Sequence, residues 1–456
     1  MLYLVLAILL LLVTNGIAGI FYKRFDLTRT KRYTLSEAAK RTVEEIDATI
    51  RIDILLGGRV PSEFRRLQAE TRYLLEEFRA VNTNILFNFV DPLADEEAGN
   101  ETVEQLRQLG LTPAAVTNEA RGRLSQELVF PWALASYGKK TVRIPLLKNK
   151  LGATAEARIT NSVQALEYAF TDAFVKLTLN KRKKIAMLKG NGELEDRYIA
   201  DFITALSGYY DIAPFTLDSV AVNPEQTLNA LGTYDLVLIA KPTEAFSGKE
   251  KYVLDQYLLN GGKMLWLIDK VSIEMEDLYN ENGTSPALPR MLNLDDLFFK
   301  YGIRIATVLV KDLYFTQIVL ASGEGNNSQY TPVPWVYSPM VFSANDHPIN
   351  TNIEALRFQF ANAIDTLSNA ITKTVLLSSS SLSKRVRTPT EISLNMIKQQ
   401  PDRATYNDGL IPLAVLLEGN FTSVFKNRVK PFSFKQAKDE GVATKVIVIS
   451  DGDLIK

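Results

Sequence analysis

Residues 1–22 form one apolar run, MLYLVLAILLLLVTNGIAGIFY, which polar side chains interrupt at Thr14 and Asn15. About 20 apolar residues are enough for a helix to cross a membrane. No charge precedes the run, whereas Lys23 and Arg24 follow it directly. This arrangement favours a retained anchor over a cleaved signal peptide or a buried helix. We therefore predict a transmembrane anchor at residues 1–22.

A juxtamembrane segment at residues 23–48 leads into a first α/β domain at residues 49–180. The capping-box spacing of Thr34 and Glu37 predicts a short helix in the juxtamembrane segment. In the domain, β-rich and amphipathic runs alternate. The predicted strands are 49–56, 85–90, 128–136 and 141–147, and the predicted helices are a long one from Pro61, 101–109 and 155–179. This order, β-α-β-α-β-β-α, is that of a thioredoxin-like domain without a Cys-x-x-Cys motif, which would dock or bind rather than exchange dithiols.

The basic segment at residues 180–184, Asn-Lys-Arg-Lys-Lys, marks the boundary of a second α/β domain at residues 181–456. Strands alternate with helices here, which predicts a mainly parallel, doubly wound sheet. The predicted strands are 184–188, 212–217, 236–240, 264–269 and 445–449, and the predicted helices are 198–206 and 249–259. Residues 271–350 are rich in Asn, Ser and Pro and predict an irregular insertion. A parallel strand that ends just before Lys456 lacks its covering helix, so we expect a chain truncated at its C-terminus.

Composition narrows the chemistry that the chain can perform. Its 456 residues are 46% hydrophobic and 23% charged, as in ordinary globular proteins. The 52 basic residues balance the 52 acidic residues, so charge gives no reason to expect a nucleic-acid partner. Cysteine is absent, and His347 is the one histidine. Disulfides, thiolate nucleophiles, zinc–thiolate sites and multi-histidine metal sites are therefore excluded.

Familiar catalytic motifs are also missing. The two Gly-Lys pairs, at 248–249 and 262–263, lack the earlier glycine and the hydroxyl of a phosphate-binding loop. There is no Gly-x-Ser-x-Gly motif, and Glu195 stands where a dinucleotide fingerprint beginning at Gly190 needs a third glycine. We therefore predict that the chain is not an enzyme and has no catalytic residue, resident cofactor or metal.

Polar and glycine residues gather where the predicted parallel strands end, which is the edge at which open α/β sheets bind ligands. This candidate ligand crevice consists of Gly190, Asn191, Gly192, Glu193, Lys241, Asp269, Asp451 and Asp453. Three interpretations stay open. The residues form turns and caps, as Asp and Gly commonly do; they bind a small ligand such as a sugar; or Asp451 and Asp453 bind a hard cation.

Three residues of the predicted insertion carry chemistry of their own. His347 lies in Asn-Asp-His-Pro and fits a turn histidine better than a catalytic base, because no partner constellation is visible. Trp335 and Tyr337 lie between prolines. They form either an exposed docking surface or buried anchors of the loop.

A series of short motifs, spread over nearly the whole chain, resembles the GldG-type gliding-motility-associated auxiliary subunits of bacterial ABC transporters. The motifs are FDLT at 25–28, RYTLS at 32–36, PSEFRRL at 61–67, LLEEF at 74–78, DQY at 255–257, GGK at 261–263, LWLID at 265–269, LLEG at 416–419 and SDGD at 450–453. The resemblance implies a protein of the bacterial inner membrane with its body in the periplasm, working beside a permease and an ATPase. It also implies a class-I-amidotransferase-like second domain, related to an intraflagellar-transport subunit family for which sugar binding has been suggested.

Some features depart from that family. Asn191 stands where relatives often have His, and the second, C-terminal membrane helix of the family is absent, which fits the expected truncation. The basic residues after the anchor would place the body in the cytoplasm, whereas the resemblance places it in the periplasm. The alternative functions are a carboxylate-based hydrolase of envelope polysaccharide and a soluble sugar-binding module.

Overall fold

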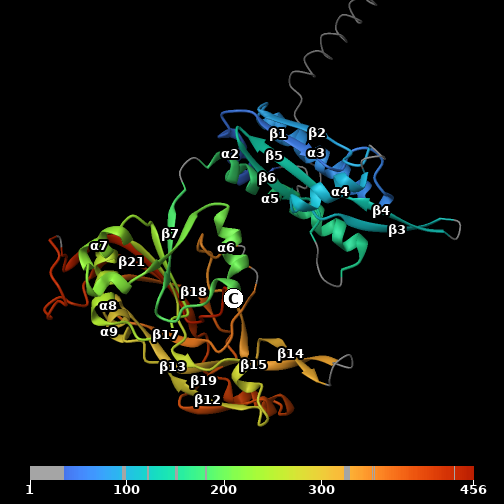
Figure 1. Cartoon of the computed structure of the whole chain (residues 1–456). Coiled ribbons are helices and arrows are strands. Elements are labelled where there is room, and N and C mark those ends of the chain that lie inside the picture. Colours follow the sequence, from blue (N-terminus) through green and yellow to red (C-terminus); the bar gives the residue numbers. More distant parts are fainter. Residues whose placement is uncertain are drawn as a thin grey trace, which may run out of the picture. The chain divides into compact units, whose positions relative to one another are not determined.

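The computed structural model describes residues 35–94, 99–120, 123–148, 153–179, 182–322, 329–351, 353, 355–435 and 437–456. The predicted anchor at residues 1–22 lies outside these residues. In the part of the chain that is described, no helix is both long and apolar enough to cross a membrane. The chain divides into two compact units, Met1–Asn180 and Lys181–Lys456. Both are mixed α/β structures (Figure 1).

The first unit is built on a four-stranded sheet. Its strand order is β2 (Ile85–Phe89), β1 (Ile50–Ile54), β5 (Trp132–Tyr137) and β6 (Lys140–Pro145). β1 pairs in parallel with β2, and the other pairs are antiparallel. Alternate residues of β1 are buried, as expected for a strand with one face on a core.

Helices supply the other half of the first core. They are α2 (Glu37–Glu44), α3 (Arg65–Val81) and α5 (Ala155–Thr178), with α4 (Gly99–Gln108) following β2 in the chain. Phe78 of α3 and Phe174 of α5 meet edge to face, with ring centroids 5.3 Å apart. The amphipathic pattern of α3 and α5 therefore buries their apolar stripes against the strands.

The predicted strand at 128–136 consists of two strands in the structure and not one. β4 (Arg123–Val129) pairs with β3 (Ala114–Ala120) in a separate two-stranded hairpin, and β5 begins only at Trp132. Pro131 lies in the break and has no N–H to donate to a ladder.

The second unit contains a ten-stranded mixed sheet. Its strand order is β14 (Phe315–Ser322), β15 (Gln329–Ser343), β18 (Thr372–Ser378), β21 (Pro412–Thr422), β22 (Glu440–Ile449), β10 (Lys263–Leu267), β9 (Leu236–Ala240), β7 (Lys184–Lys189) and β8 (Asp211–Thr216), with β16 (Leu356–Arg357) on β15. From β22 to β8 the neighbours are parallel. From β14 to β22 they are antiparallel. The prediction of a mainly parallel sheet therefore holds for half of it, because β14–β15 and β21–β22 reverse the chain without a crossover helix.

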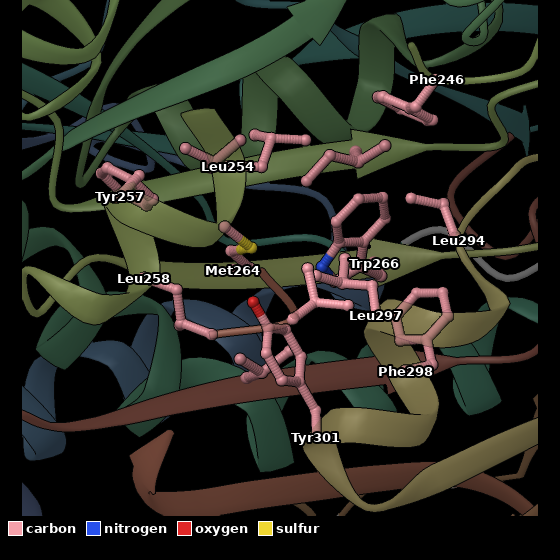
Figure 2. Packing of buried hydrophobic residues seen from close by; sticks show 14 of the residues in the cluster. Phe246, Leu254, Tyr257, Leu258, Met264, Trp266, Leu294, Leu297, Phe298 and Tyr301 are labelled. Carbon is pink, nitrogen blue, oxygen red and sulfur yellow. The ribbon is translucent and has the colours of Figure 1, made fainter. Parts of the chain in front are cut away.

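Helices cover both faces of the parallel half. One face carries α7 (Pro224–Leu231), α8 (Gly248–Leu259) and α9 (Asp295–Tyr301), whereas α6 (Ala200–Ser207) covers the other. Every residue from Lys251 to Leu259 is buried, so α8 is a core helix rather than a surface one. Figure 2 shows side chains of this core, where the ring of Trp266 lies 5.4 Å from that of Phe298.

Residues 271–350 differ from the irregular insertion that the composition predicts. They contain α9, β14, β15 and three further strands, β11 (Val271–Ser272), β12 (Thr284–Pro289) and β13 (Ile303–Asp312). Later segments complete two small sheets around these strands, through β17 (Asn362–Thr366), β19 (Ser383–Arg387) and β20 (Thr390–Ser393). Pairing with partners far along the chain stabilises a segment whose local sequence resembles a loop.

Trp335 and Tyr337 of this region are core anchors, whereas His347 lies in a turn. Trp335 is 1% and Tyr337 2% exposed, in an apolar cluster with Phe360. The backbone N–H of His347 donates to Asn345 Oδ1, and its ring Nδ1 accepts from the N–H of Ile349. The buried interpretation of Trp335 and Tyr337 is therefore the one that the structure supports.

Candidate functional site

Three neighbouring strands bring the central candidate residues together. Leu267 at the end of β10 pairs with Ala240 of β9 on one side and with Ile449 of β22 on the other. The ladder continues one step further, since the N–H of Lys241 donates to the carbonyl of Leu267. Parallel strands end at one edge of the sheet. Lys241, Asp269 and residues 450–453 consequently meet there, as the alternation of strands and helices predicts.

At this edge, Lys241 is the centre of an ion cluster, which we define as Lys241, Asp269, Glu274, Asp451 and Asp453. Its Nζ lies 2.5 Å from Asp453 Oδ2, 2.5 Å from Glu274 Oε2 and 3.5 Å from Asp269 Oδ2. The Lys241 side chain is only 5% exposed. Its backbone lies in the left-handed region, at φ 55°, which disfavours a side chain with a Cβ. The contacts of the ammonium therefore hold a strained residue in place.

Backbone N–H groups donate to carboxylate oxygens of Asp269 and Asp451, whereas the buried Oδ1 of Asp453 has no hydrogen-bond partner among the described residues. Asp269 Oδ1 accepts from the N–H of Gly452 at 2.7 Å. Asp451 Oδ2 accepts from the N–H of Gln359 at 2.7 Å, and its Oδ1 accepts from the N–H of Asp453 at 2.8 Å. The two aspartates thus fix the turn that follows β22.

Gly452 is required for this close packing. A Cβ at this position would lie 2.5 Å from Cγ of Lys241 and 2.8 Å from Oδ2 of Asp269. Both distances are shorter than van der Waals contact, so a side chain would push the lysine and the carboxylate apart.

Burial and mutual repulsion shift the protonation of the carboxyl groups. Burial, together with the charge of Asp453, raises the pKa of Asp269 from 3.8 to about 6, against the attraction of Lys241. Burial and the charge of Asp269 raise the pKa of Asp451 well above its usual range. Desolvation disfavours the Lys241 ammonium, but the charges of Asp269, Asp453 and Glu274 outweigh it and raise its pKa. The lysine is therefore permanently charged at neutral pH, whereas two carboxyl groups retain protons more tightly than usual.

Glu274 and Arg290 belong to the neighbourhood of the cluster although sequence analysis omitted them. Arg290 Nη2 lies 3.5 Å from Glu274 Oε1, and its buried Nη1 makes no hydrogen bond with the described residues. Both residues come from the segment predicted to be irregular. A sequence signal was present only for Glu274, an acidic residue two positions after the strand Val271–Ser272.

The remaining candidates, Gly190 to Glu193, form a second group beside the loop at residues 243–244. The carbonyl of Asn191 accepts from the N–H groups of Thr243 and Glu244, both at 2.9 Å. A Cβ on Gly192 would lie 2.0 Å from Thr243 Oγ1, so this turn requires glycine. The described contacts tie the turn to this loop and not to the ion cluster.

Glu193 is the one candidate in this turn with an unsatisfied side-chain atom. Its Oε2 accepts from the N–H of Asn191 at 2.8 Å, while its buried Oε1 has no hydrogen-bond partner among the described residues. Burial raises the pKa of this carboxyl. A buried, unpaired acceptor is suited to receive a donor from a ligand hydroxyl or amide.

The arrangement favours structural support over chemistry at Lys241. An ammonium that contacts three carboxylates is not available as a nucleophile or base. Asp451 directs both oxygens at backbone N–H groups, which leaves little capacity for a cation. Within the described ranges, no three His, Cys, Asp or Glu side chains are placed to hold a metal ion.

Comparisons with solved structures give distant matches. The N-terminal domain of mmIFT52 is 14% identical, with 60% of this chain and 88% of that chain covered and a TM-score of 0.35. A ThuA-like protein from Parabacteroides merdae ATCC 43184 is 12% identical, with 60% and 84% covered and a TM-score of 0.28. A search of curated proteins gives no match.

Family models match both units. Residues 29–136 match a domain of unknown function, DUF7088. Residues 182–456 match the auxiliary family described as "ABC-type uncharacterized transport system". Because this second match covers more than half of the chain, the protein belongs to the auxiliary family of ABC-type uncharacterized transport systems.

Proposed function

We propose that this chain is a membrane-anchored, non-catalytic accessory subunit that works beside the permease and the ATPase of a bacterial ABC transporter. The observation that carries the proposal is the family match over residues 182–456, which indicates an accessory role in an ABC-type transport system. The chain has no phosphate-binding loop of its own, so ATP hydrolysis would come from a partner.

The finer features of the proposal rest on the sequence. The apolar run at residues 1–22 would anchor the chain in the inner membrane. The GldG-type motifs imply a body in the periplasm and an association with gliding motility. They also imply a class-I-amidotransferase-like layer in the second unit. The thioredoxin-like order proposed for the first unit rests on its predicted strands and helices.

The geometry of the ion cluster supports a scaffold role. Lys241 joins the end of β9 to Asp269 after β10 and to Asp453 after β22. Each of these groups is nearly buried. Removing one partner of a buried ion pair strongly destabilises the folded state, because the other charge stays buried without compensation. The cluster would therefore hold the ends of β9, β10 and β22 in one conformation. The surface that this edge offers to partner proteins would keep the same shape.

A carbohydrate-like ligand is a further part of the proposal. The turn from Gly190 to Glu193 lies at the carboxyl end of β7, where open α/β sheets bind ligands. The unpaired Oε1 of Glu193 would accept a hydrogen bond from a sugar hydroxyl. Lys241, Asp269, Asp451 and Asp453 would then hold the neighbouring part of the sheet edge in place and would not contact the ligand.

Purification of the full-length chain from native membranes tests the proposal. After extraction in a mild detergent, an ABC permease and an ATPase should co-purify with the chain. An unrelated protein with one membrane anchor and similar abundance serves as the control. A chain that emerges alone, or with the same proteins as the control, would contradict the proposal.

One observation favours the alternative of a carboxylate-based hydrolase of envelope polysaccharide. Asp269 and Asp451 are both buried, and burial raises the pKa of each, as a general acid requires. If the alternative holds, the purified chain hydrolyses envelope polysaccharide, and Asp269→Asn abolishes the reaction. If the scaffold proposal holds, neither protein is active, and Asp269→Asn still co-purifies with the transporter.

A further inference from the structure

Two lysines face each other across β13 and β19, outside the set of candidate crevice residues. The strands are antiparallel, and Lys311 pairs directly with Lys384. The next residues on the same face of each strand, Leu309 and Val386, also pair with each other and belong to or pack against one apolar cluster. Like charges placed directly opposite each other destabilise a sheet.

The surroundings of the two ammonium groups make this repulsion more costly. Both side chains are half-buried. Lys311 Nζ lies 4.8 Å from the centroid of the Tyr337 ring, and the ring is almost completely buried. The ring face attracts a cation, but one ring does not neutralise two charges.

The nearby carboxylates are engaged elsewhere. Asp312 accepts from the N–H and the hydroxyl of Ser380 and from the N–H of Tyr314. Asp408 accepts from the N–H of Arg385. Among the described residues, neither lysine of the pair forms an ion pair with a carboxylate. Burial and the charge of Lys384 accordingly lower the pKa of Lys311 to about 8.

We infer that Lys311 and Lys384 form a binding site for an oxyanion, the carboxylate or phosphate group of a small ligand. An oxyanion between the two ammonium groups replaces their repulsion with two charge-assisted hydrogen bonds. The apolar side chains beneath it exclude water and strengthen these bonds. The site is separate from the candidate crevice and does not depend on the proposed function.

Thermal unfolding of the full chain in increasing sodium phosphate, sodium acetate or sodium chloride at matched ionic strength tests the site. Phosphate or acetate should raise Tm beyond the effect of chloride, because a ligand that binds the native state stabilises it. A response to phosphate alone identifies a phosphate-type ligand, and a response to acetate alone identifies a carboxylate. Equal responses to all three salts overturn the inference.

Two variants and one control locate the effect. Lys384→Met and Lys311→Met should each weaken anion binding about tenfold or more, since each removes a charged hydrogen-bond donor. Lys249→Met removes a charge at an exposed lysine of α8 and should leave binding unchanged. Without anion, Lys384→Met should have an equal or higher Tm, because it removes the repulsion. Full anion binding by Lys384→Met would contradict the assignment even if Lys311→Met fails to fold.

Discussion

Along β9, β10 and β22 most buried side chains are apolar, whereas residues just past the ends of these strands contribute to the ion cluster. Trp266 of β10 packs edge to face against Phe246 and Phe298. Three residues later, the carboxylate of Asp269 forms an ion pair with Lys241 and accepts a hydrogen bond from the N–H of Gly452. The apolar region is stabilised by close packing, so a substitution that removes side-chain volume there lowers the free energy of unfolding. The ion cluster is stabilised by paired charges and responds to the loss of one partner and to pH.

The largest effect should come from the apolar region. Trp266→Ala removes a fully buried ring from between two aromatic side chains and should lower the free energy of unfolding by about 4 kcal/mol. Urea denaturation measures this loss. Trp266→Phe should cost about half as much, because it retains a ring and because the indole Nε1 has no hydrogen-bond partner among the described residues to lose. Equal losses in both variants would show that ring packing is not what Trp266 contributes.

In the ion cluster, the largest loss should follow removal of the central cation. Lys241→Met leaves Asp269, Glu274 and Asp453 without their shared partner and should cost about 3 kcal/mol at pH 7. Acid should reduce the loss, because protonated carboxyl groups no longer repel one another. Urea denaturation at pH 7 and pH 5 measures both effects. Lys249→Met, at an exposed position, should change the free energy of unfolding by less than about 0.5 kcal/mol. A similar loss in both variants would contradict the stabilising role of the ion cluster.

The pH dependence of stability separates the two regions further. The pKa of Asp269 rises from 3.8 to about 6 on folding, so the native state binds more protons than the unfolded state between these values. Its contribution to stability is therefore full below about pH 4 and is lost as the pH rises to about 6. In Asp269→Asn the decline in stability from pH 4 to pH 6 should be smaller than in the wild type by about 2 kcal/mol.

Asp365→Asn is a control of opposite sign for that experiment. Burial raises the pKa of Asp365, but hydrogen bonds from Arg304 and Arg385 outweigh it, and the pKa is lowered overall. Its contribution is present above its unfolded pKa and is lost as the pH falls through the lower folded value. Above about pH 4 the variant should therefore be less stable than the wild type. Between pH 4 and pH 6 its free energy of unfolding should change with pH as much as that of the wild type does. If Asp269→Asn behaves in the same way, the raised pKa of Asp269 is wrong.

The smallest effect should come from the cap of α8. The hydroxyl of Ser247 accepts from the N–H of Glu250, whose carboxylate accepts from the N–H of Ser247. Ser247→Ala should cost about 1 kcal/mol, since the helix is held mainly by its buried residues. Hydrogen exchange of α8 measures the loss. Thr154→Ala removes the cap of α5 in the first unit and should leave exchange in α8 unchanged.

The ion cluster shows how far sequence reasoning extends. Lys241, Asp269, Asp451 and Asp453 could be grouped because each follows a predicted parallel strand, and parallel strands end at one edge. Glu274 could not be added, because its position depends on β11 and β12, which pair residues 16 and 18 positions apart, Ser272 with Leu288 and Val271 with Pro289. The antiparallel half of the sheet was missed for another reason. β18 and β21 contain apolar runs typical of buried strands, but such a run does not specify whether its neighbours pair in parallel or antiparallel.

For the turn from Gly190 to Glu193, the sequence predicts the position in the fold but not the contacts. Its place at the end of β7 follows from the pattern of strands and glycines. Its contacts with Thr243 and Glu244 do not, because a sequence pattern specifies the edge of a sheet and not which loops meet there.

The most direct test of the accessory role is purification of the wild type and Asp269→Asn, side by side, from native membranes, with quantification of the associated proteins by mass spectrometry. On the proposed accessory role, we predict that both forms recover an ABC permease and an ATPase in the same ratio, because an asparagine side-chain oxygen can still accept from the N–H of Gly452 and keep the turn in place. Recovery of the wild type without either transporter component would contradict the account.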